Sequence, residues 1–181
     1  MRLVIGLMGR IGSGKTAVSE HLQENYGARE HRFSQILMDI LDRLNLPHER
    51  ANLQKLGKSL RAELGADVIV NAFKHDLEKD TKELLIVDGI RYENEVNMLK
   101  EKNCVLIFVT ASPEVRYERA VKRGEKGEAK ITFEQFLESE KAETEKHIEA
   151  IKESADYTID NSGTLNELQG KVDKIIKGLK K

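Results

Sequence analysis

The sequence predicts an α/β protein in which helices cover both faces of a five-stranded parallel sheet, giving a three-layer α/β/α fold. Three nearly continuous apolar runs, at 2–8, 83–89 and 104–111, are typical of buried parallel strands. Helical patterns separate these runs along the chain. Strands that alternate with helices imply a parallel sheet with right-handed crossover connections.

Weaker patterns and capping residues predict the remaining elements. Short strands at 28–32 and 155–161 complete the five. Gly27 is expected to end the first helix, because glycine readily adopts the left-handed conformation found there. Two capping boxes mark the starts of later helices. They are Thr132 with Gln135 and Thr164 with Glu167. The predicted helices cover 14–27, 34–44, 50–64, 66–79, 92–103, 113–123, 132–154 and the segment after 164.

A chain of 181 residues is long enough for one domain with a full core. The helical block at 34–79 is too long for a simple crossover, so we expect a helical subdomain over one edge of the sheet. The polar segment 124–131 contains glycines and is expected to form a lid. The expected division is a core of 1–33, 80–123 and 155–181, the insert 34–79, and the lid with its following helix at 124–154.

The composition is typical of a soluble globular protein. Hydrophobic residues make up 39% of the chain, charged residues make up 34%, and the net charge is -1. This balance does not suggest a nucleic-acid or membrane-surface protein, and no apolar stretch approaches the ~20 residues of a membrane span. The single cysteine, Cys104, cannot form an internal disulfide. We expect a cytoplasmic monomer or homodimer with no nucleic-acid and no membrane partner.

The stretch "GRIGSGKT" follows the first strand and fits the phosphate-binding pattern G-x-x-x-x-G-K-[ST]. Glycines let backbone N–H groups converge on phosphate oxygens, and the next helix points its positive dipole end at the same place. The alternative is a plain glycine turn, but a strand before and a helix after favour a P-loop NTPase fold. The residues expected to bind ATP here are Gly9, Arg10, Ile11, Gly12, Ser13, Gly14, Lys15 and Thr16.

A strand-end aspartate is the candidate partner of this loop. Asp88 ends the run "LLIVD", and ligands of open α/β sheets bind at the carboxyl ends of strands. We expect Asp88 and the Thr16 hydroxyl to hold Mg²⁺, while Lys15 supplies positive charge to the β- and γ-phosphates. A simple turn at Asp88-Gly89 is the alternative.

Arginines supply the candidate phosphate contacts. Arg91, three residues after Asp88, is expected to be catalytic and to clamp the acceptor, and Arg61 on the insert is a second acceptor contact. One helix carries three further arginines at spacings of three and four. They are Arg116, Arg119 and Arg123. Arg123 is expected to be a catalytic cation of the lid, and Arg119 to contact the nucleotide. A solvated charged face explains each of these arginines equally well.

With these motifs in place, the chain resembles P-loop kinases of the nucleoside monophosphate kinase group over nearly its whole length. "VDGIR" is similar to the Asp-Gly-Phe-Pro-Arg segment of adenylate kinases, where Asp supports Mg²⁺ and Arg contacts phosphate. "DGIRYENEVNML" resembles dephospho-coenzyme A kinase-related archaeal proteins and phage-type deoxynucleoside monophosphate kinases. "ADYTIDNSGTLNELQGKV" resembles the end of dephospho-coenzyme A kinases, which implies that Asn161 flanks the adenine. A tight turn is the alternative role for Asn161.

The chain departs from these families after its second strand. Dephospho-coenzyme A kinases carry an aspartate there that serves the acceptor hydroxyl, whereas this chain has Phe33, Ser34 and Gln35, and Asp39 follows a helical turn later. Ser34 is therefore the candidate acceptor contact. A phosphate acceptor needs no strong base, because its oxygen is already a nucleophile.

The sequence therefore favours transfer of the γ-phosphoryl group of ATP, with Mg²⁺, to a (deoxy)nucleoside monophosphate. Dephospho-coenzyme A is the alternative acceptor. A nucleotide-dependent ATPase switch without a small acceptor is the alternative from another class, and a nucleotide-binding protein without catalysis is a third. A GTPase is disfavoured because the chain has no Asn-Lys-x-Asp motif.

Overall fold

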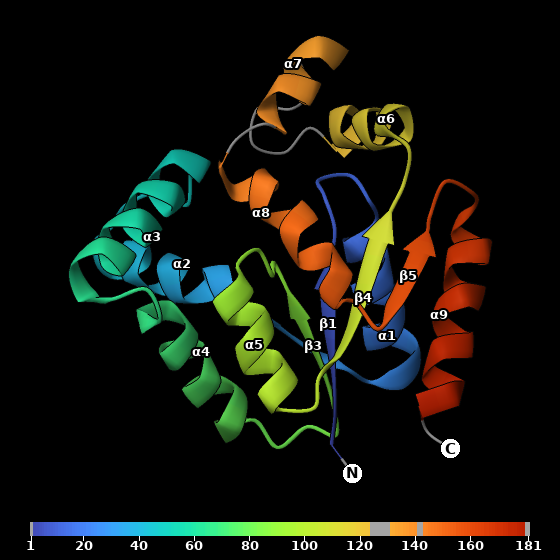
Figure 1. Ribbon diagram of the computed structural model, residues 1–181, viewed down its shortest axis with the longest axis horizontal. Coiled ribbons are helices and arrows are strands. Elements are labelled where there is room, and N and C mark those ends of the chain that lie inside the picture. The colour runs from blue at the N-terminus through green and yellow to red at the C-terminus, as the bar shows by residue number, and fades with distance from the viewer. Residues whose placement is uncertain (1, 124–130, 141–142, 180–181) are drawn as a thin grey trace.

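The computed structural model describes residues 2–123, 131–140 and 143–179. Its five strands form one parallel sheet in the order β2-β3-β1-β4-β5 (Figure 1). The strands are β1 (Leu3–Met8), β2 (Arg29–Arg32), β3 (Leu84–Asp88), β4 (Val105–Thr110) and β5 (Tyr157–Asp160). The predicted three-layer α/β/α fold with a five-stranded parallel sheet is confirmed.

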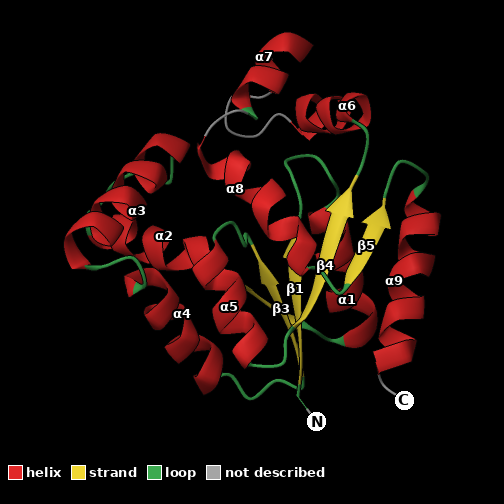
Figure 2. Ribbon diagram, viewed as in Figure 1, coloured by secondary structure: helices red, strands yellow, loops and turns green. Residues whose placement is uncertain are grey.

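Helices connect the strands and cover both faces of the sheet, as the red and yellow ribbons of Figure 2 show. The first six are α1 (Lys15–Tyr26), α2 (Phe33–Arg43), α3 (Arg50–Leu64), α4 (Val68–Lys79), α5 (Glu93–Glu101) and α6 (Pro113–Arg123). The others are α7 (Phe133–Ser139), α8 (Glu143–Ile151), a 3-10 turn at Lys152–Ser154, and α9 (Leu165–Leu179).

Two apolar cores lie on opposite faces of the sheet, because successive strand residues point to opposite sides. Val4 and Met8 of β1 pack with α2, α4, α5 and α8 on one face. Ile5 and Leu7 pack with α1 and α9 on the other. Both faces of the central strands are therefore buried, as the continuous apolar runs predict.

The strand register aligns the carboxyl ends of the strands along one edge of the sheet. Arg32 of β2 lies opposite Asp88 of β3, Gly6 of β1 lies opposite Val87, and Met8 lies opposite Phe108 of β4. The loop between β1 and α1 therefore begins beside the end of β3. This register places the two predicted phosphate-binding segments at the same edge.

The predicted helix ends are confirmed where local capping determines them. Gly27 adopts φ 64° and its N–H donates to the Gln23 carbonyl, which ends α1. The Thr132 hydroxyl accepts from the Gln135 N–H at 3.2 Å, while the Gln135 side chain accepts from the Thr132 N–H. Thr164 and Glu167 form the corresponding pair before α9.

The single long helix predicted at 132–154 is wrong. Helix α7 ends at Ser139, and α8 begins at Glu143. Glu140, which follows α7, is 7% exposed and pairs with Arg116 of α6. The break between the two helices thus coincides with the burial of this carboxylate against α6. Most of the predicted lid, residues 124–130, lies outside the described residues.

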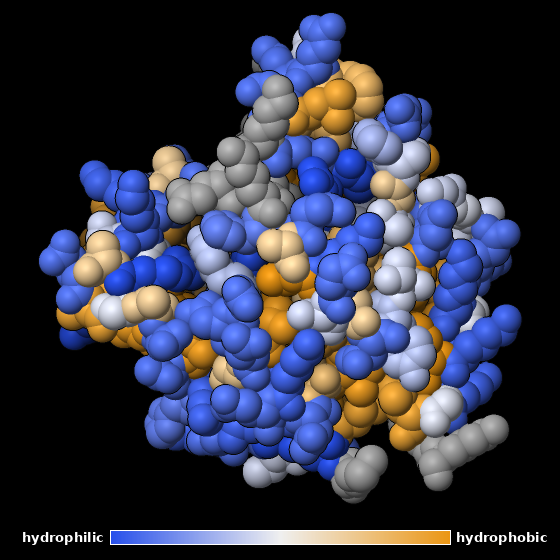
Figure 3. All heavy atoms as spheres, viewed as in Figure 1, coloured by the Kyte–Doolittle hydropathy of each residue, from blue (hydrophilic) through white to orange (hydrophobic). Residues whose placement is uncertain are grey.

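Helices α2, α3 and α4 of the insert pack on one another beside the β2 edge of the sheet (Figure 1). The face of the molecule in Figure 3 is mostly polar, with apolar atoms in small groups. Across the described ranges, no helix has both the length and the apolar composition needed to span a bilayer.

Candidate functional site

The glycine-rich loop has the backbone conformation that its sequence requires. Gly12 and Gly14 adopt φ values of 76° and 103°, which side chains of L-residues rarely allow. A Cβ on Gly12 would lie 2.3 Å from the Arg116 carbonyl oxygen, and one on Gly14 would lie 2.1 Å from the Asn161 amide nitrogen. The loop therefore packs closely against α6 and against the end of β5.

The side chain of the loop lysine, Lys15, bonds to backbone carbonyls of the same loop. Lys15 Nζ donates to the Gly9 carbonyl at 2.8 Å and to the Arg10 carbonyl at 3.3 Å. Thr16 follows in the first turn of α1 and is exposed. The ammonium group and the hydroxyl are thus both at the loop, which is the arrangement that the motif predicts.

Three side-chain atoms in the described part of the chain are buried and make no hydrogen bond. They are Ser13 Oγ, Asp88 Oδ1 and Arg119 Nη1. Buried polar atoms in native proteins almost always have a partner, and leaving one unpaired costs about 1–3 kcal/mol. Two of the three, Ser13 and Asp88, lie at the edge where β1 and β3 end. Arg119 reaches this edge from α6, because its Nη1 lies 3.9 Å from a Cβ placed on Gly14. These three atoms give the loop unused hydrogen-bonding capacity that a bound ligand can take up.

A further cation lies beside Asp88 that the sequence patterns did not reveal. Arg32, the last residue of β2, places Nε 3.9 Å from Asp88 Oδ2 and pairs with Glu30 at 2.7 Å. Glu30 in turn accepts a hydrogen bond from Ser19 of α1 at 2.6 Å. Only the strand register, which aligns Arg32 with Asp88, brings this arginine to the site.

The three arginines of α6 have different surroundings rather than one solvated stripe. Arg116 is 5% exposed, makes two contacts with the Glu140 carboxylate, and donates from Nε to the Ala111 carbonyl at 3.1 Å. Arg119 is half-buried and turned toward the loop, and Arg123 is exposed at the end of α6. Arg116 is thus held by a carboxylate and not by solvent, because α7 covers it.

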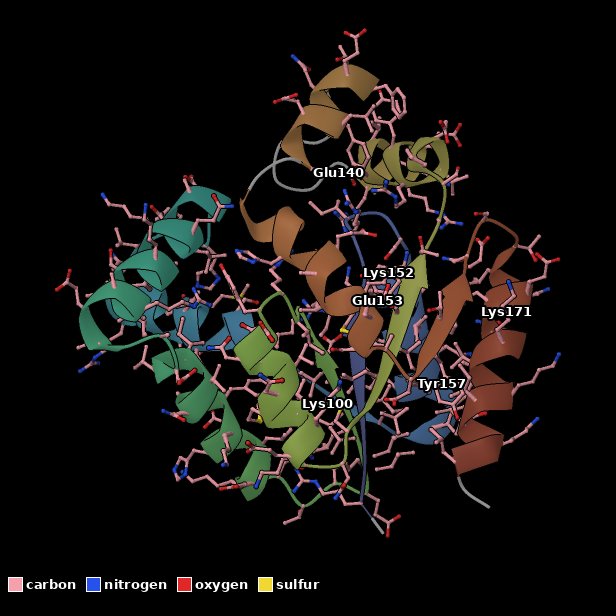
Figure 4. All side chains as sticks on the ribbon, viewed as in Figure 1. Lys100, Glu140, Lys152, Glu153, Tyr157 and Lys171 are labelled. Carbon is pink, nitrogen blue, oxygen red and sulfur yellow. The ribbon has the colours of Figure 1, made fainter. Side chains whose placement is uncertain are left out.

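The second loop residue, Arg10, connects the loop to the α7–α8 region. Its guanidinium lies 3.4 Å from Glu140 and 3.3 Å from Glu149 of α8. Figure 4 labels Glu140 in the space between α7, α6 and the loop after β1. A buried carboxylate shared by Arg10 and Arg116 thus joins the loop, α6 and the end of α7.

Asn161, which follows β5, bonds to the backbone of the glycine-rich loop. Its amide donates to the Ser13 carbonyl at 2.9 Å, and its backbone N–H donates to the Thr110 carbonyl at 2.7 Å. The side chain is 4% exposed. In this conformation Asn161 therefore positions the loop backbone from the end of β5.

A buried carboxyl that was not predicted contacts the backbone of Arg91 and lies near the side chain of Arg61. Glu95 of α5 accepts from the backbone N–H groups of Arg91 and Tyr92 at 2.7 and 3.2 Å. Arg61 Nη2 lies 3.8 Å from Glu95 Oε1. Burial raises the pKa of Glu95 to about 7, although these N–H groups and the two arginine charges oppose the rise. Ser34, in the first turn of α2, is half-buried.

The donor set suits a magnesium ion that keeps ligands from a bound nucleotide. The described residues contain no group of three or more His, Cys, Asp or Glu able to hold a metal by themselves. Asp88 Oδ1 is a buried oxygen without a partner, and the Thr16 hydroxyl is on the adjoining helix. Mg²⁺ commonly binds through one or two protein oxygens together with phosphates and water, so these residues fit it.

The parallel sheet and glycine-rich loop define a P-loop protein with a kinase-like fold. The family described as an AAA domain matches residues 5–161. A UPF0200 protein of Methanocaldococcus jannaschii is 30% identical over 177 residues, covering 96% of this chain and 89% of that protein. The chain therefore belongs to the AAA domain family and to the UPF0200 family.

Other relatives and solved structures agree. A UPF0200 protein of Hyperthermus butylicus is 27% identical over 179 residues, covering 98% of this chain and 95% of that protein. The crystal structure of TT1252 from Thermus thermophilus has a TM-score of 0.64 at 19% identity, covering 98% of each chain. Shikimate kinase from Acinetobacter baumannii in complex with shikimate has a TM-score of 0.62 at 20% identity, covering 99% of this chain and 96% of that one. These structural likenesses show the fold.

Proposed function

We propose that this protein is an ATP-dependent phosphotransferase that moves the γ-phosphoryl group of ATP to a nucleoside monophosphate or deoxynucleoside monophosphate. The observation that carries the proposal is the set of three buried, unpartnered polar atoms at the loop: Ser13 Oγ, Asp88 Oδ1 and Arg119 Nη1. A hydroxyl, a carboxylate oxygen and a guanidinium nitrogen together suit a metal-bound polyphosphate, because each finds a partner on it.

The positions of the loop residues support a role for each in this reaction. Lys15 exchanges its two backbone carbonyls for phosphate oxygens, which it binds as a point charge. Asp88 and Thr16 would hold Mg²⁺, which would neutralise charge on the phosphates when bound. Arg119 adds a cation from α6, and Arg123 adds another at the end of that helix.

The acceptor site lies on the insert side of Asp88. Arg91 lies three residues after the end of β3, and Ser34 is the second residue after β2. The Arg61 side chain extends from α3 to within 3.8 Å of Glu95 in the first turn of α5. Asp39 does not replace the missing base, since it is exposed on α2 and accepts from Gln35 at 2.7 Å. Two arginines without a carboxylate base after β2 favour a phosphate acceptor over a hydroxyl such as that of dephospho-coenzyme A.

The test is a phosphotransfer assay of the purified protein with ATP, Mg²⁺ and a panel of acceptors. The panel contains nucleoside and deoxynucleoside monophosphates, dephospho-coenzyme A and shikimate. We expect acceptor-dependent ADP release with at least one monophosphate and none in a Lys15→Ala variant of unchanged melting temperature. ADP release that no acceptor stimulates, or normal turnover by Lys15→Ala, would contradict the proposal and favour an ATPase switch.

A further inference from the structure

Helix α3 contains a glycine that a helix would ordinarily avoid. Gly57 is buried in the middle of α3, where glycine lowers helix stability relative to alanine. A Cβ on Gly57 would lie 2.9 Å from Arg61 Nη1 and 3.2 Å from Leu37 Cδ1. The missing side chain therefore gives the Arg61 guanidinium room to fold back along its own helix.

Two residues after β3, Tyr92 and Glu95, lie next to the Arg61 guanidinium. The Arg61 guanidinium carbon lies 4.3 Å from the centroid of the Tyr92 ring, within the range of a cation–π contact. Glu95 lies 3.8 Å from Arg61 Nη2 and is 2% exposed. Arg61 thus contacts two residues after β3 although it belongs to the insert.

The local charge favours an anion. Arg61 and Arg91 are both close enough to lower the pKa of Glu95, so two cations surround this one carboxyl. The contact between Arg61 and Glu95 is longer than a hydrogen bond, which leaves guanidinium N–H groups to donate elsewhere. Side-chain exposure of Arg61 is 25%, so a ligand can reach it.

We propose that Gly57, Tyr92 and Glu95 are positioning residues that hold the Arg61 guanidinium at the carboxyl end of β3, where it binds the phosphate group of the acceptor. This inference rests on the proposed phosphotransfer for its biological meaning. The anion site itself is a property of the four side-chain positions and can be measured without turnover. It assigns the acceptor to compounds that already carry a phosphate, rather than to neutral alcohols.

The test uses two matched glycine substitutions in helices. Gly57→Ala removes the room for Arg61, whereas Gly170→Ala in α9 places the same methyl group in open space. Both substitutions improve helix propensity, so the melting temperature of Gly170→Ala should stay level or rise by about 2–4 °C. In Gly57→Ala the close approach to Arg61 and Leu37 offsets this gain, so its melting temperature should lie below that of Gly170→Ala. Sulfate is titrated calorimetrically into protein whose loop is saturated with ADP and Mg²⁺. We expect Gly57→Ala to bind sulfate at least about tenfold more weakly than wild type, and Gly170→Ala to match wild type.

A second pair covers the possibility that the methyl group at 57 disturbs α3 through Leu37. Tyr92→Phe keeps the ring face beneath Arg61 and should retain sulfate affinity, whereas Tyr92→Leu should lose several-fold. Equal sulfate affinity in folded Gly57→Ala, Gly170→Ala and wild-type proteins would overturn the inference. Failure of the wild-type protein to bind sulfate would do the same.

Kinetics separate this inference from the proposed function. In an active protein, Gly57→Ala should raise the acceptor KM about tenfold and leave the KM for ATP unchanged. If transfer occurs but the acceptor KM is equal in the Gly57→Ala and Gly170→Ala proteins, the positioning inference falls and the phosphotransfer stands. If no acceptor is phosphorylated while sulfate binding follows the expected pattern, the phosphotransfer falls and the anion site stands.

Discussion

Replacing Glu95 by glutamine should change how the stability of this protein depends on pH. Glu95 has a pKa of 4.5 as an ordinary side chain and about 7 in the folded protein, chiefly because burial opposes its charge. Between these values the folded state keeps a proton that the unfolded state has released. The free energy of unfolding therefore falls as pH rises from about 4.5 to 7, and is fully lowered above 7. At ~1.4 kcal/mol per pH unit, the total loss is about 3 kcal/mol.

Glu95→Gln removes this loss because the amide has no charge at any pH in the range. Its carbonyl oxygen can still accept from the backbone N–H groups of Arg91 and Tyr92. Urea unfolding followed by circular dichroism at pH 5, 6, 7 and 8 gives the difference in stability between variant and wild type. That difference should shift by about 2–3 kcal/mol in favour of the variant between pH 5 and 8. Glu101→Gln, on the exposed side of the same helix, is the control and should show no such trend. A constant difference between Glu95→Gln and wild type across the four pH values would refute the reasoning.

Three other substitutions, one of them paired with a comparison variant, test separate parts of the structure. Gly12→Ala forces a side chain into a backbone conformation with φ 76° and against the Arg116 carbonyl, so it should lower the free energy of unfolding by about 1–3 kcal/mol and weaken MgADP binding. Thermal denaturation with and without the nucleotide measures both effects. A shift in melting temperature on adding ADP that equals the wild-type shift would count against the loop geometry. Glu140→Gln leaves the buried Arg116 charge uncompensated, so it should lower the free energy of unfolding measured in urea by about 3 kcal/mol. Arg10→Ala keeps the pair between Arg116 and Glu140 and should lower that free energy by less than about 1 kcal/mol. Equal losses in the two variants would contradict the role of Glu140 as the partner of Arg116. Burial opposes ionisation of Asp80, but hydrogen bonds from the Lys82 N–H and from the side chains of His31 and Arg29 lower its pKa from 3.8 to about 2. This lowered pKa adds roughly 2 kcal/mol to the free energy of unfolding above pH 4, and that stabilisation is lost as pH falls through 2. Asp80→Asn should therefore be less stable than wild type by roughly 2 kcal/mol at pH 6 and by only about 1 kcal/mol at pH 2.5, and an equal deficit at both pH values would rule this out.

Local sequence patterns were sufficient to predict most of the fold. The helix predicted at 50–64 has the same bounds as α3, and the helix predicted at 113–123 has those of α6, because capping residues and hydrophobic periodicity are encoded within each segment. The glycine-rich loop and the strand-end Asp88 were also visible, since both depend on neighbours in the chain. The roles of the site residues remain predictions.

Features that depend on distant contacts could not be predicted in this way. Arg32 reaches Asp88 only through the pairing of β2 with β3. Arg116 looks like part of an exposed charged stripe until Glu140, 24 positions later, is buried against it. Glu95 reads as an ordinary residue in the first turn of α5, and only the fold brings Arg61 beside it. In each case the deciding partner belongs to another element, so no local spacing could indicate it.

The central claim is that the buried, unpartnered groups at the loop are completed by a nucleotide polyphosphate. Its most direct test is calorimetric titration of a non-hydrolysable ATP analogue with Mg²⁺ into wild type, Arg119→Ala, and the exposed control Lys122→Ala on the same helix. We expect one analogue bound per wild-type chain, unchanged affinity in Lys122→Ala, and a loss of about tenfold or more in Arg119→Ala. Absence of binding to the wild-type protein, or equal affinity in all three proteins, would contradict the account.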